Sequence, residues 1–403
     1  MRIFITTLLA GFLLLFYNDV KSQNTNTYDP SIQTIVDAVN GDTIWNYISD
    51  LVPLQRLSSN TSAIQSSDFL KNYFLSLGFD TVYFQTYSSY IPNVIAVKYG
   101  TIYPDSVIVV GAHYDVYASS APGADDNGSG TAAVMEIGCV IMGNDYKRTI
   151  KLVCFSGEEQ GLLGSEAYAD AASSAGEKII AAITMDMIAY LKSGDPINSD
   201  VYYNTASTAL KNNYASITGL YVPGFAVADA TYPTGAGSDV EPFWNNGFKA
   251  IFPCEGQYSW LPQNDHCSPY MHTASDVLNT SANSQEQATK ITQSVVATVV
   301  TLAELDQQTS MQSIYNEDLF NFSVFPNPAS TDIDISYNIA CASEVRINLI
   351  DMRAKTLKTF YNATRQAGAY AEKYSVADVK PGIYLLQINS DDVSITKKII
   401  ICY

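Results

Sequence analysis

Six side chains that can bind a metal or move a proton draw attention, because most of them directly follow apolar runs long enough to be buried strands. They are His113, Asp115, Glu158, Glu159, Asp186 and His272. The chain has only three histidines and only 15% of its residues are charged, so chance is a poor explanation of this grouping. Nitrogen and oxygen donors of this kind suit a hydrolytic zinc site.

His113 and Asp115 stand two residues apart at the end of the first apolar run, residues 107–112. Side chains at i and i+2 project to the same side of a strand. His113 can therefore offer one ring nitrogen to a metal while Asp115 accepts the other ring N–H. Shortly afterwards, Asp125 lies among the small residues of 123–130. A carboxylate at such a strand-to-helix turn is well placed to bridge two cations.

Glu158 and Glu159 follow the second apolar run. Adjacent glutamates cannot easily bind one metal together, because their side chains diverge, so we expect one to be a ligand and the other a base. Asp186 follows the next run, and His272 supplies a second imidazole far downstream. Open α/β sheets place their sites outside the carboxyl ends of the strands. We therefore expect these residues to meet at one edge of a sheet.

Apolar runs and helical patterns alternate between residues 34 and 305. Residues 34–78 have helical spacing, and Gly78 is expected to end that stretch. The expected strands are residues 93–98, 106–111, 150–155, 179–185 and 249–252, and the expected helices are residues 130–142, 162–172 and 285–305. Several of the strands are continuously apolar, as strands covered on both faces are. The pattern predicts an α/β domain with a mostly parallel central sheet between helix layers.

The pattern changes near residue 308. Apolar and polar residues alternate with period two in residues 333–337, 345–349 and 383–387, with turn residues between them and no helical segment. Short alternating strands without helices predict a small all-β sandwich. We therefore expect an α/β domain over residues 23–310 and a β-sandwich domain over residues 311–403.

Residues 1–22 are expected to be a secretory signal peptide, because Arg2 precedes an uncharged apolar run that ends before Ser22. That run is shorter than the roughly 20 residues that a membrane-spanning helix needs, and no later stretch is long enough, so we expect no stable membrane span. A net charge of −18 argues against a nucleic-acid partner and fits a soluble protein outside the cell.

The six cysteines include no CxxC pair, which argues against a thiolate zinc site or a thioredoxin-type motif. Export permits disulfides. Cys254 and Cys267 bracket a short loop and are the best local pair, and Cys341 and Cys402 are a candidate pair within the C-terminal domain. The other two cysteines lie in apolar runs, where buried thiols are common.

The motifs together resemble a known family, the co-catalytic zinc aminopeptidases related to glutaminyl cyclases. The similar segments, in order and spacing, are His113-x-Asp115, Gly123-Ala-Asp125-Asp126, Gly157-Glu158-Glu159-x-Gly161, Asp186-Met187 and His272-Thr273-x-x-Asp276. The likeness runs from about Ile35 to Leu305. It implies a zinc exopeptidase-like fold, two Zn²⁺ ions per chain, and hydrolysis of the N-terminal bond of peptides with a free N-terminus.

The resemblance also implies a ligand set. His113 and Asp186 would hold one zinc, Glu159 and His272 would hold the other, and Asp125 would bridge the two. The turn between Asp125 and Asp126 often contains a cis peptide bond in that family.

The remaining catalytic roles follow from the same resemblance. Glu158 would be the general base, which takes a proton from water and delivers it to the leaving amine. Asp115 would orient His113, and Asp276 would support the loop of His272.

Substrate contacts are less well defined. Relatives often carry a histidine after Ser-Asp, where this chain has Ser238-Asp239-Val240, and Asp239 is a candidate contact in that segment. Tyr258 is a second candidate, because it stands where a tyrosine can donate to a developing oxyanion. His266 is expected to be a loop residue and not a third metal-binding histidine.

The C-terminal region resembles the sorting domain of proteins exported by type IX secretion. The residues concerned are Phe325-Pro326-Asn327-Pro328, Lys380-Pro381-Gly382-Ile383-Tyr384 and Lys397-Lys398-Ile399-Ile400. The resemblance implies an address that the secretion machinery reads, often removed afterwards, and a secreted or cell-surface protein whose last domain has no catalytic part.

Three other functions remain open at this point. A glutaminyl cyclase shares the scaffold but uses one zinc, and a non-enzymatic domain would have lost its ligands. A carboxypeptidase needs a cation for the substrate carboxylate, and no Arg or Lys is evidently placed for that role. The complete ligand set favours the aminopeptidase, whereas the native metal and the preferred N-terminal residue stay open.

Overall fold

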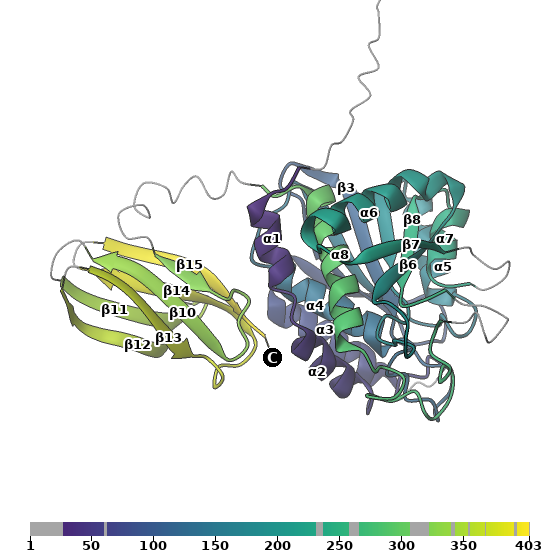
Figure 1. Cartoon of the computed structure of the whole chain (residues 1–403), viewed down its shortest axis with the longest axis horizontal. Coiled ribbons are helices and arrows are strands. Elements are labelled where there is room, and N and C mark those ends of the chain that lie inside the picture. The colour runs from purple at the N-terminus through teal and green to yellow at the C-terminus, as the bar shows by residue number, and fades with distance from the viewer. Residues whose placement is uncertain are drawn as a thin grey trace, which may run out of the picture.

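The structure is a computed structural model that describes residues 27–59, 63–230, 237–257, 266–306, 322–339, 343–353, 355–366, 368–390 and 393–402. These residues form an α/β domain and a smaller all-β domain (Figure 1). The expected signal peptide and the expected boundary near residue 310 both lie outside the described residues, so they stay predictions. Among the described helices, none combines the length and the apolar character that crossing a membrane requires.

An eight-stranded sheet forms the centre of the α/β domain, in the order β1-β2-β4-β3-β5-β8-β6-β7. Its strands are β1 (Thr81–Gln85), β2 (Asn93–Lys98), β3 (Tyr103–His113), β4 (Arg148–Phe155), β5 (Lys178–Thr184), β6 (Asn198–Tyr203), β7 (Ala226–Ala230) and β8 (Ala250–Cys254). The central strands β4, β3, β5 and β8 are parallel, whereas β1 and β2, β2 and β4, and β6 and β8 pair antiparallel. The predicted mostly parallel centre is confirmed, and the sequence pattern does not reveal the antiparallel flanks.

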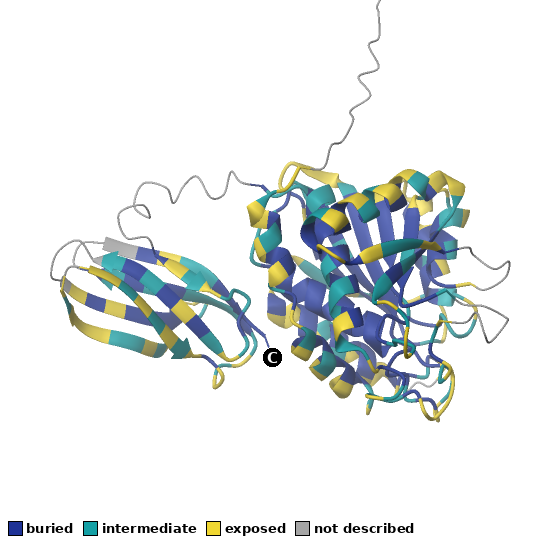
Figure 2. Cartoon of the chain, viewed as in Figure 1, coloured by how far each residue is buried: buried dark blue, intermediate teal, exposed yellow. Residues whose placement is uncertain are grey.

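Helices cover both faces of this sheet, as predicted. One face carries α1 (Pro30–Asp37), α2 (Gly41–Leu51), α3 (Ile64–Leu77), α4 (Gly128–Ile141), α6 (Thr208–Tyr221) and α8 (Gln285–Ala303), and the other carries α5 (Leu163–Ser174) and α7 (Val240–Asn245). In β3, Ile108 and Val110 pack into the core under the first group of helices, and Val107 and Val109 pack into the core under α5 and α7. Burial on both faces explains the continuous apolar runs, and Figure 2 shows the sheet interior buried throughout.

The C-terminal domain is a β-sandwich, as predicted. One sheet has the order β13-β10-β9 and the other the order β12-β11-β14-β15. The strands are β9 (Ser323–Phe325), β10 (Asp332–Ile339), β11 (Ser343–Ile350), β12 (Thr356–Arg365), β13 (Gly368–Ser375), β14 (Gly382–Ser390) and β15 (Val393–Ile401). Ile335 of β10 and Ile347 of β11 share one core, so the two sheets pack face to face.

The cysteine pairings differ from those expected. Cys139 in α4 and Cys402 after β15 form a disulfide between the two domains. The predicted Cys341–Cys402 bond is therefore wrong, because Cys402 points away from the sandwich and toward the α/β domain. Cys254 and Cys267 are not joined to each other either, since each thiol donates to the carbonyl of Gly256 at 3.1 Å.

Candidate metal centre

The carboxyl ends of three adjacent strands carry the residues that the sequence singled out. His113 is the last residue of β3, Glu158 and Glu159 follow β4, and Asp186 follows β5. Because β4, β3 and β5 are parallel neighbours in the sheet, their ends deliver these side chains to one place. His272 reaches the same place from the segment between β8 and α8.

The donor atoms fall into two adjoining groups, each of three atoms within 4.8 Å of one another: His113, Glu158 and Asp186 in the first, and Asp126, Glu159 and His272 in the second. In the first group, Nε2 of His113 lies 3.3 Å from Oδ1 of Asp186. In the second, Nε2 of His272 lies 3.1 Å from Oε2 of Glu159. The spacing suits two cations held side by side.

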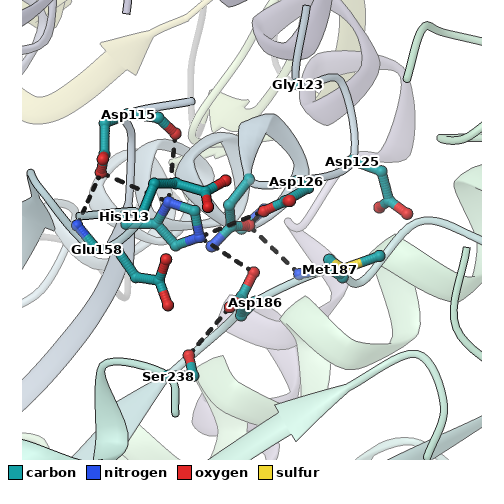
Figure 3. A network of polar contacts seen from close by, with 12 residues as sticks. His113, Asp115, Gly123, Asp125, Asp126, Glu158, Asp186, Met187 and Ser238 are labelled. Carbon is teal, nitrogen blue, oxygen red and sulfur yellow. Dashed lines mark hydrogen bonds and ion pairs between the residues drawn. The ribbon is translucent and has the colours of Figure 1, made fainter. Parts of the chain in front are cut away.

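Asp126, and not Asp125, lies between the two groups. Its Oδ1 is 3.4 Å from Nε2 of His113, and its Oδ2 is 3.1 Å from Nε2 of His272. The Asp125 carboxylate points away from the His113 imidazole (Figure 3) and accepts a hydrogen bond from the Ala189 N–H at 3.0 Å. The assignment of the bridging role to Asp125 is therefore wrong by one residue. The cis peptide bond is also one residue later, between Asp126 and Asn127.

The loop that carries Asp126 is held by a carboxylate and an arginine. Asp276 accepts from the N–H of Asp125 at 2.9 Å and from the N–H of Asp126 at 3.1 Å. Its carboxylate therefore supports the loop of Asp126, whereas the sequence predicted support for the loop of His272. The Arg56 guanidinium is 1% exposed and donates to the carbonyls of Pro122 and Gly123 at 2.5 and 2.6 Å. Both contacts fix the backbone just before the Asp126 carboxylate.

Glu255, directly after β8, ties three loops of the site together. Its carboxylate accepts from the N–H of Tyr190 at 2.6 Å and from the N–H of Ser268 at 2.9 Å. Its carboxyl also faces that of Asp125, and burial together with the Asp125 charge raises the pKa of Glu255 well above its usual value. Because each loop carries or precedes a candidate metal-binding side chain, Glu255 acts as a brace beneath the site.

Asp115 lies behind His113, as the sequence predicts. Its Oδ1 is 3.6 Å from Nδ1 of His113 and accepts a hydrogen bond from the N–H of Glu158 at 3.3 Å. Asp115 therefore touches both the imidazole and the backbone of the expected base, and leaves Nε2 of His113 directed at Asp126 and Asp186.

Electrostatics support cation binding here. Burial raises the pKa of Glu158 well above its usual value, and the Asp186 charge adds to the rise. Burial and the Asp126 charge likewise raise the pKa of Glu159 to about 7. Burial lowers the pKa of His272, but the carboxylates of Asp126 and Glu159 outweigh it and bring the value to about 10. Buried carboxylates crowded around two imidazoles are stabilised by a nearby positive charge.

The donor set itself fits zinc. It offers two imidazoles and several carboxylates, the nitrogen and oxygen ligands of hydrolytic zinc sites. Oε1 of Glu159 is buried and has no hydrogen-bond partner among the described residues. A cation at this position would satisfy that oxygen.

A cavity of about 450 Å³ opens over the two groups. Its wall is mostly apolar and includes Tyr117, Leu162, Met187, Tyr202, Phe252 and Met271. The Tyr117 ring stacks on the His272 imidazole with 4.1 Å between centroids, which fixes the ring plane of that ligand. Among the described residues that line the cavity there is no Lys or Arg.

Of the two expected substrate contacts, only Asp239 is among the described residues. Asp239 is 1% exposed and does not line the cavity, and burial raises the pKa of its carboxyl to about 7. The neighbouring Ser238 does line the cavity and donates to Oδ2 of Asp186 at 3.0 Å. Tyr258 lies outside the described residues. His266 pairs with Asp195 at 2.6 Å and belongs to neither donor group, as expected.

Comparison with known proteins identifies the family. Residues 93–299, just over half of the chain, match the profile of peptidase family M28. The chain belongs to peptidase family M28. The M28 match contains every candidate ligand, from His113 to His272. Residues 323–402 match the secretion system C-terminal sorting domain, which indicates export. Both resemblances drawn from the sequence are thus confirmed.

Individual relatives agree with the M28 assignment. A probable leucine aminopeptidase of Trichophyton verrucosum is 29% identical over 198 residues, which cover 46% of this chain and 50% of the relative. A probable zinc metalloprotease of Pyrenophora teres f. teres is 32% identical over 189 residues, which cover 40% of this chain and 39% of the relative. The chain thus spans about half the length of such relatives, or less.

Solved structures of the same fold include the LapA aminopeptidase of Legionella pneumophila, with a TM-score of 0.61 at 24% identity, covering 71% of this chain and 79% of LapA. A glutaminyl cyclase of Porphyromonas gingivalis has a TM-score of 0.54 at 20% identity, covering 65% of this chain and 98% of the cyclase. At these identities the likeness shows the fold, and the choice between the two activities rests on the site.

Proposed function

We propose that this M28 protein is an exported zinc aminopeptidase that holds two Zn²⁺ ions and removes N-terminal residues from peptides. The observation that carries the proposal is the pair of donor groups joined by Asp126, with Glu158 beside them. His113 and Asp186 would hold one ion, Glu159 and His272 the other, and the two oxygens of Asp126 would each face one. Type IX secretion machinery would read the C-terminal domain and deliver the enzyme outside the cell.

When bound, two zinc ions would polarise the scissile carbonyl and increase the acidity of a water molecule. The Glu158 carboxylate would accept a proton from the attacking water and then pass it to the nitrogen of the leaving amine. Burial raises the pKa of Glu158, which suits a group that must both take up and return a proton. Asp115 would keep the His113 ring in place through these steps.

The charge of the cavity favours an aminopeptidase over a carboxypeptidase. Four acidic side chains line it, Asp126, Glu158, Glu159 and Asp186, and no Lys or Arg does so among the described residues. Two bound zinc ions would offset those four charges, so the preference rests on the lack of a cation among the described lining residues. A substrate carboxylate would find no Lys or Arg among these residues to pair with, whereas a substrate α-ammonium group needs none. The apolar wall would then receive the side chain of the N-terminal residue, so we expect a preference for large apolar residues.

Metal content and hydrolysis together test the proposal. Purified full-length protein should contain about two zinc ions per chain, as a co-catalytic site requires. It should release aminoacyl anilides with a free N-terminus, and chelation should abolish that release. One zinc ion, no hydrolysis and cyclisation of N-terminal glutamine would instead place the chain with the glutaminyl cyclases.

A matched pair of variants tests the ligand assignment. Asp126→Asn should lower the content of both metals, because the amide carries no negative charge and keeps one oxygen, so it cannot offer an oxygen to each group. Asp125→Asn should keep both, since the amide oxygen can still accept from the Ala189 N–H and the amide nitrogen can donate to Glu255. Loss of metal from Asp125→Asn with retention in Asp126→Asn would overturn the assignment.

A third variant tests the base. Glu158→Gln should reduce kcat by about 10²-fold or more, as loss of a general base does, while metal content stays at the wild-type value. Loss of metal from this variant would make Glu158 a ligand instead.

A further inference from the structure

The last strand of the chain has two apolar faces. In β15, Ile399 and Ile401 belong to the core of the sandwich, whereas Ile400 and the following Cys402 belong to the core of the α/β domain. Successive side chains of a strand point to opposite sides, which explains the division. Ile400 is 0% exposed and Cys402 is 6% exposed. An edge strand of a free domain would instead present a polar face to water.

The neighbouring strand completes the contact. Ile383 of β14 pairs with Ile400 and packs against the same α/β core. It lies against Gly78, the residue that ends α3 with φ of 80°, and a Cβ on Gly78 would collide with Cδ1 of Ile383. We call Ile383, Ile400 and Cys402 the docking patch.

A charged residue lies at the border of this patch. Burial lowers the pKa of Lys398, the nearby Lys98 lowers it further, and Asp145 and Asp80 oppose the fall. Lys98, Asp145 and Asp80 all belong to the α/β domain. The border of the contact is therefore polar, as in protein interfaces generally.

A covalent bond closes the contact. Cys139, which is 2% exposed in α4, is joined to Cys402. The C-terminal domain positions Cys402 itself, because Asn327 donates to the Lys398 carbonyl at 3.0 Å and accepts from the Ile400 N–H at 2.8 Å. The Cys402 N–H donates to the Ala329 carbonyl at 2.8 Å. The thiol is thus presented by a fixed segment and not by a loose tail.

We propose that the C-terminal domain is a retained part of the mature enzyme, held on the α/β domain by the docking patch and the Cys139–Cys402 bond. Cutting the chain between residues 307 and 321, outside the described residues, would leave two pieces that stay together. Sorting domains of this kind are often removed, whereas the docking patch and the disulfide would keep this one attached. The inference stands independently of the metal centre.

Separation of the pieces then needs a reductant as well as a cut. A dithiol gives two electrons and two protons to the Cys139–Cys402 bond, which becomes two thiols, and the dithiol itself becomes a disulfide. Formation is the reverse exchange with an oxidised disulfide-carrying catalyst, which the oxidising compartments outside the cytosol provide.

The test uses the full chain, exported through an oxidising compartment, with the recognition sequence of a site-specific protease in place of residues 310–315. After cutting, we expect one band on a denaturing gel without reductant and two bands with it. The same chain carrying Cys402→Ser should give two bands without reductant. Two bands from the unreduced chain with native cysteines, or peptide mapping that pairs Cys402 with another cysteine, would overturn the proposal.

The docking patch is tested on the cut chain carrying Cys402→Ser, by gel filtration. The two pieces should elute together, and a further Ile400→Asp change should separate them. Thr396→Asp, an exposed position of the same strand, is the matched control and should leave them together.

A change on the other domain guards against misfolding of the sandwich. Gly78→Asn introduces a residue that also tolerates the left-handed conformation at the helix end. The asparagine side chain, however, would collide with Ile383. This variant should also separate the pieces of the Cys402→Ser chain. If the two pieces still elute together in both the Ile400→Asp and the Gly78→Asn variants, the docking patch is refuted. Zinc content and hydrolysis should be unchanged in either variant.

Discussion

Replacement of Arg56 should reveal how much of the metal centre depends on a residue that touches no metal. Arg56 is buried and donates to the carbonyls of Tyr114, Pro122 and Gly123, at 3.2, 2.5 and 2.6 Å. Burial lowers its pKa to about 10, while the charges of Asp276, Asp115 and Asp126 oppose the fall, so the guanidinium stays charged at neutral pH.

The magnitude follows from those contacts. Arg56→Met keeps most of the aliphatic stem but leaves the carbonyls of Tyr114 and Pro122 without their donor, at about 1–3 kcal/mol each. The Gly123 carbonyl still accepts from the Gly128 N–H at 3.0 Å. It also removes the positive charge that faces the carboxylates of the site. Breaking a buried ionic contact by removing one partner costs about 3–5 kcal/mol. We therefore expect the free energy of unfolding of the α/β domain to fall by about 3–5 kcal/mol.

Tryptophan fluorescence during urea unfolding measures this change in one domain, because all three tryptophans precede the β-sandwich in the sequence. The titration is run with chelator and with excess zinc, since ligand binding adds to the apparent stability. Arg346→Met, an exposed arginine of the C-terminal domain, is the control and should change the free energy by less than about 0.5 kcal/mol. Zinc affinity of Arg56→Met should also fall, because the loop of Asp126 loses its support. A loss below about 1 kcal/mol, within the ordinary range of surface substitutions, would refute the reasoning.

Three further predictions concern other buried or contacting groups. Burial raises the pKa of Glu136 in α4 to about 8, so the folded state holds a proton between that pH and the unfolded value of 4.5. The free energy of unfolding therefore keeps the full contribution of protonated Glu136 below pH 4.5 and falls by up to about 4 kcal/mol as the pH rises toward 8. Glu136→Gln should make this fall smaller in urea titrations from pH 5 to 8. Glu255→Ala should weaken zinc binding by about 10–100-fold in competition with a chelating dye, whereas Glu255→Gln should weaken it less; equal losses would contradict the bracing role. Tyr117→Phe should keep the ring stacked on His272 and leave kcat unchanged, while Tyr117→Ala should lower kcat, and identical kinetics for both would show that the stacking has no effect.

The sequence predicts the parts of this molecule that local pattern controls. Strands β3, β4 and β5 are visible because both of their faces are buried and their residues are continuously apolar. The ends of these strands could be predicted because polar or charged residues follow directly. His113, Glu158 and Asp186 could therefore be placed at one edge of the sheet. Strands β1 and β7, by contrast, are half-buried or exposed at sheet margins and carry no such run.

The features that the sequence could not predict depend on the direction in which a side chain points and on contacts between residues far apart in the chain. Asp125 and Asp126 are chemically identical neighbours, and only the backbone of their loop decides which one faces the imidazoles. Arg56 lies far in sequence from the carbonyls it holds, so nothing near it in the chain marks its role. Cys139 and Cys402 are separated by 263 residues, and no spacing rule connects them.

The glycine that ends α3 bears on how this protein can vary between species. Where the two domains dock as described, position 78 must satisfy both a left-handed backbone and the end of the Ile383 side chain, so glycine is favoured there over any residue with a Cβ. In a related chain that lacks the second domain, the first requirement remains and the second disappears, so asparagine becomes a neutral replacement. The identity of this one residue should therefore follow the presence of the sandwich through the family and act as a marker of docking in sequences without a structure.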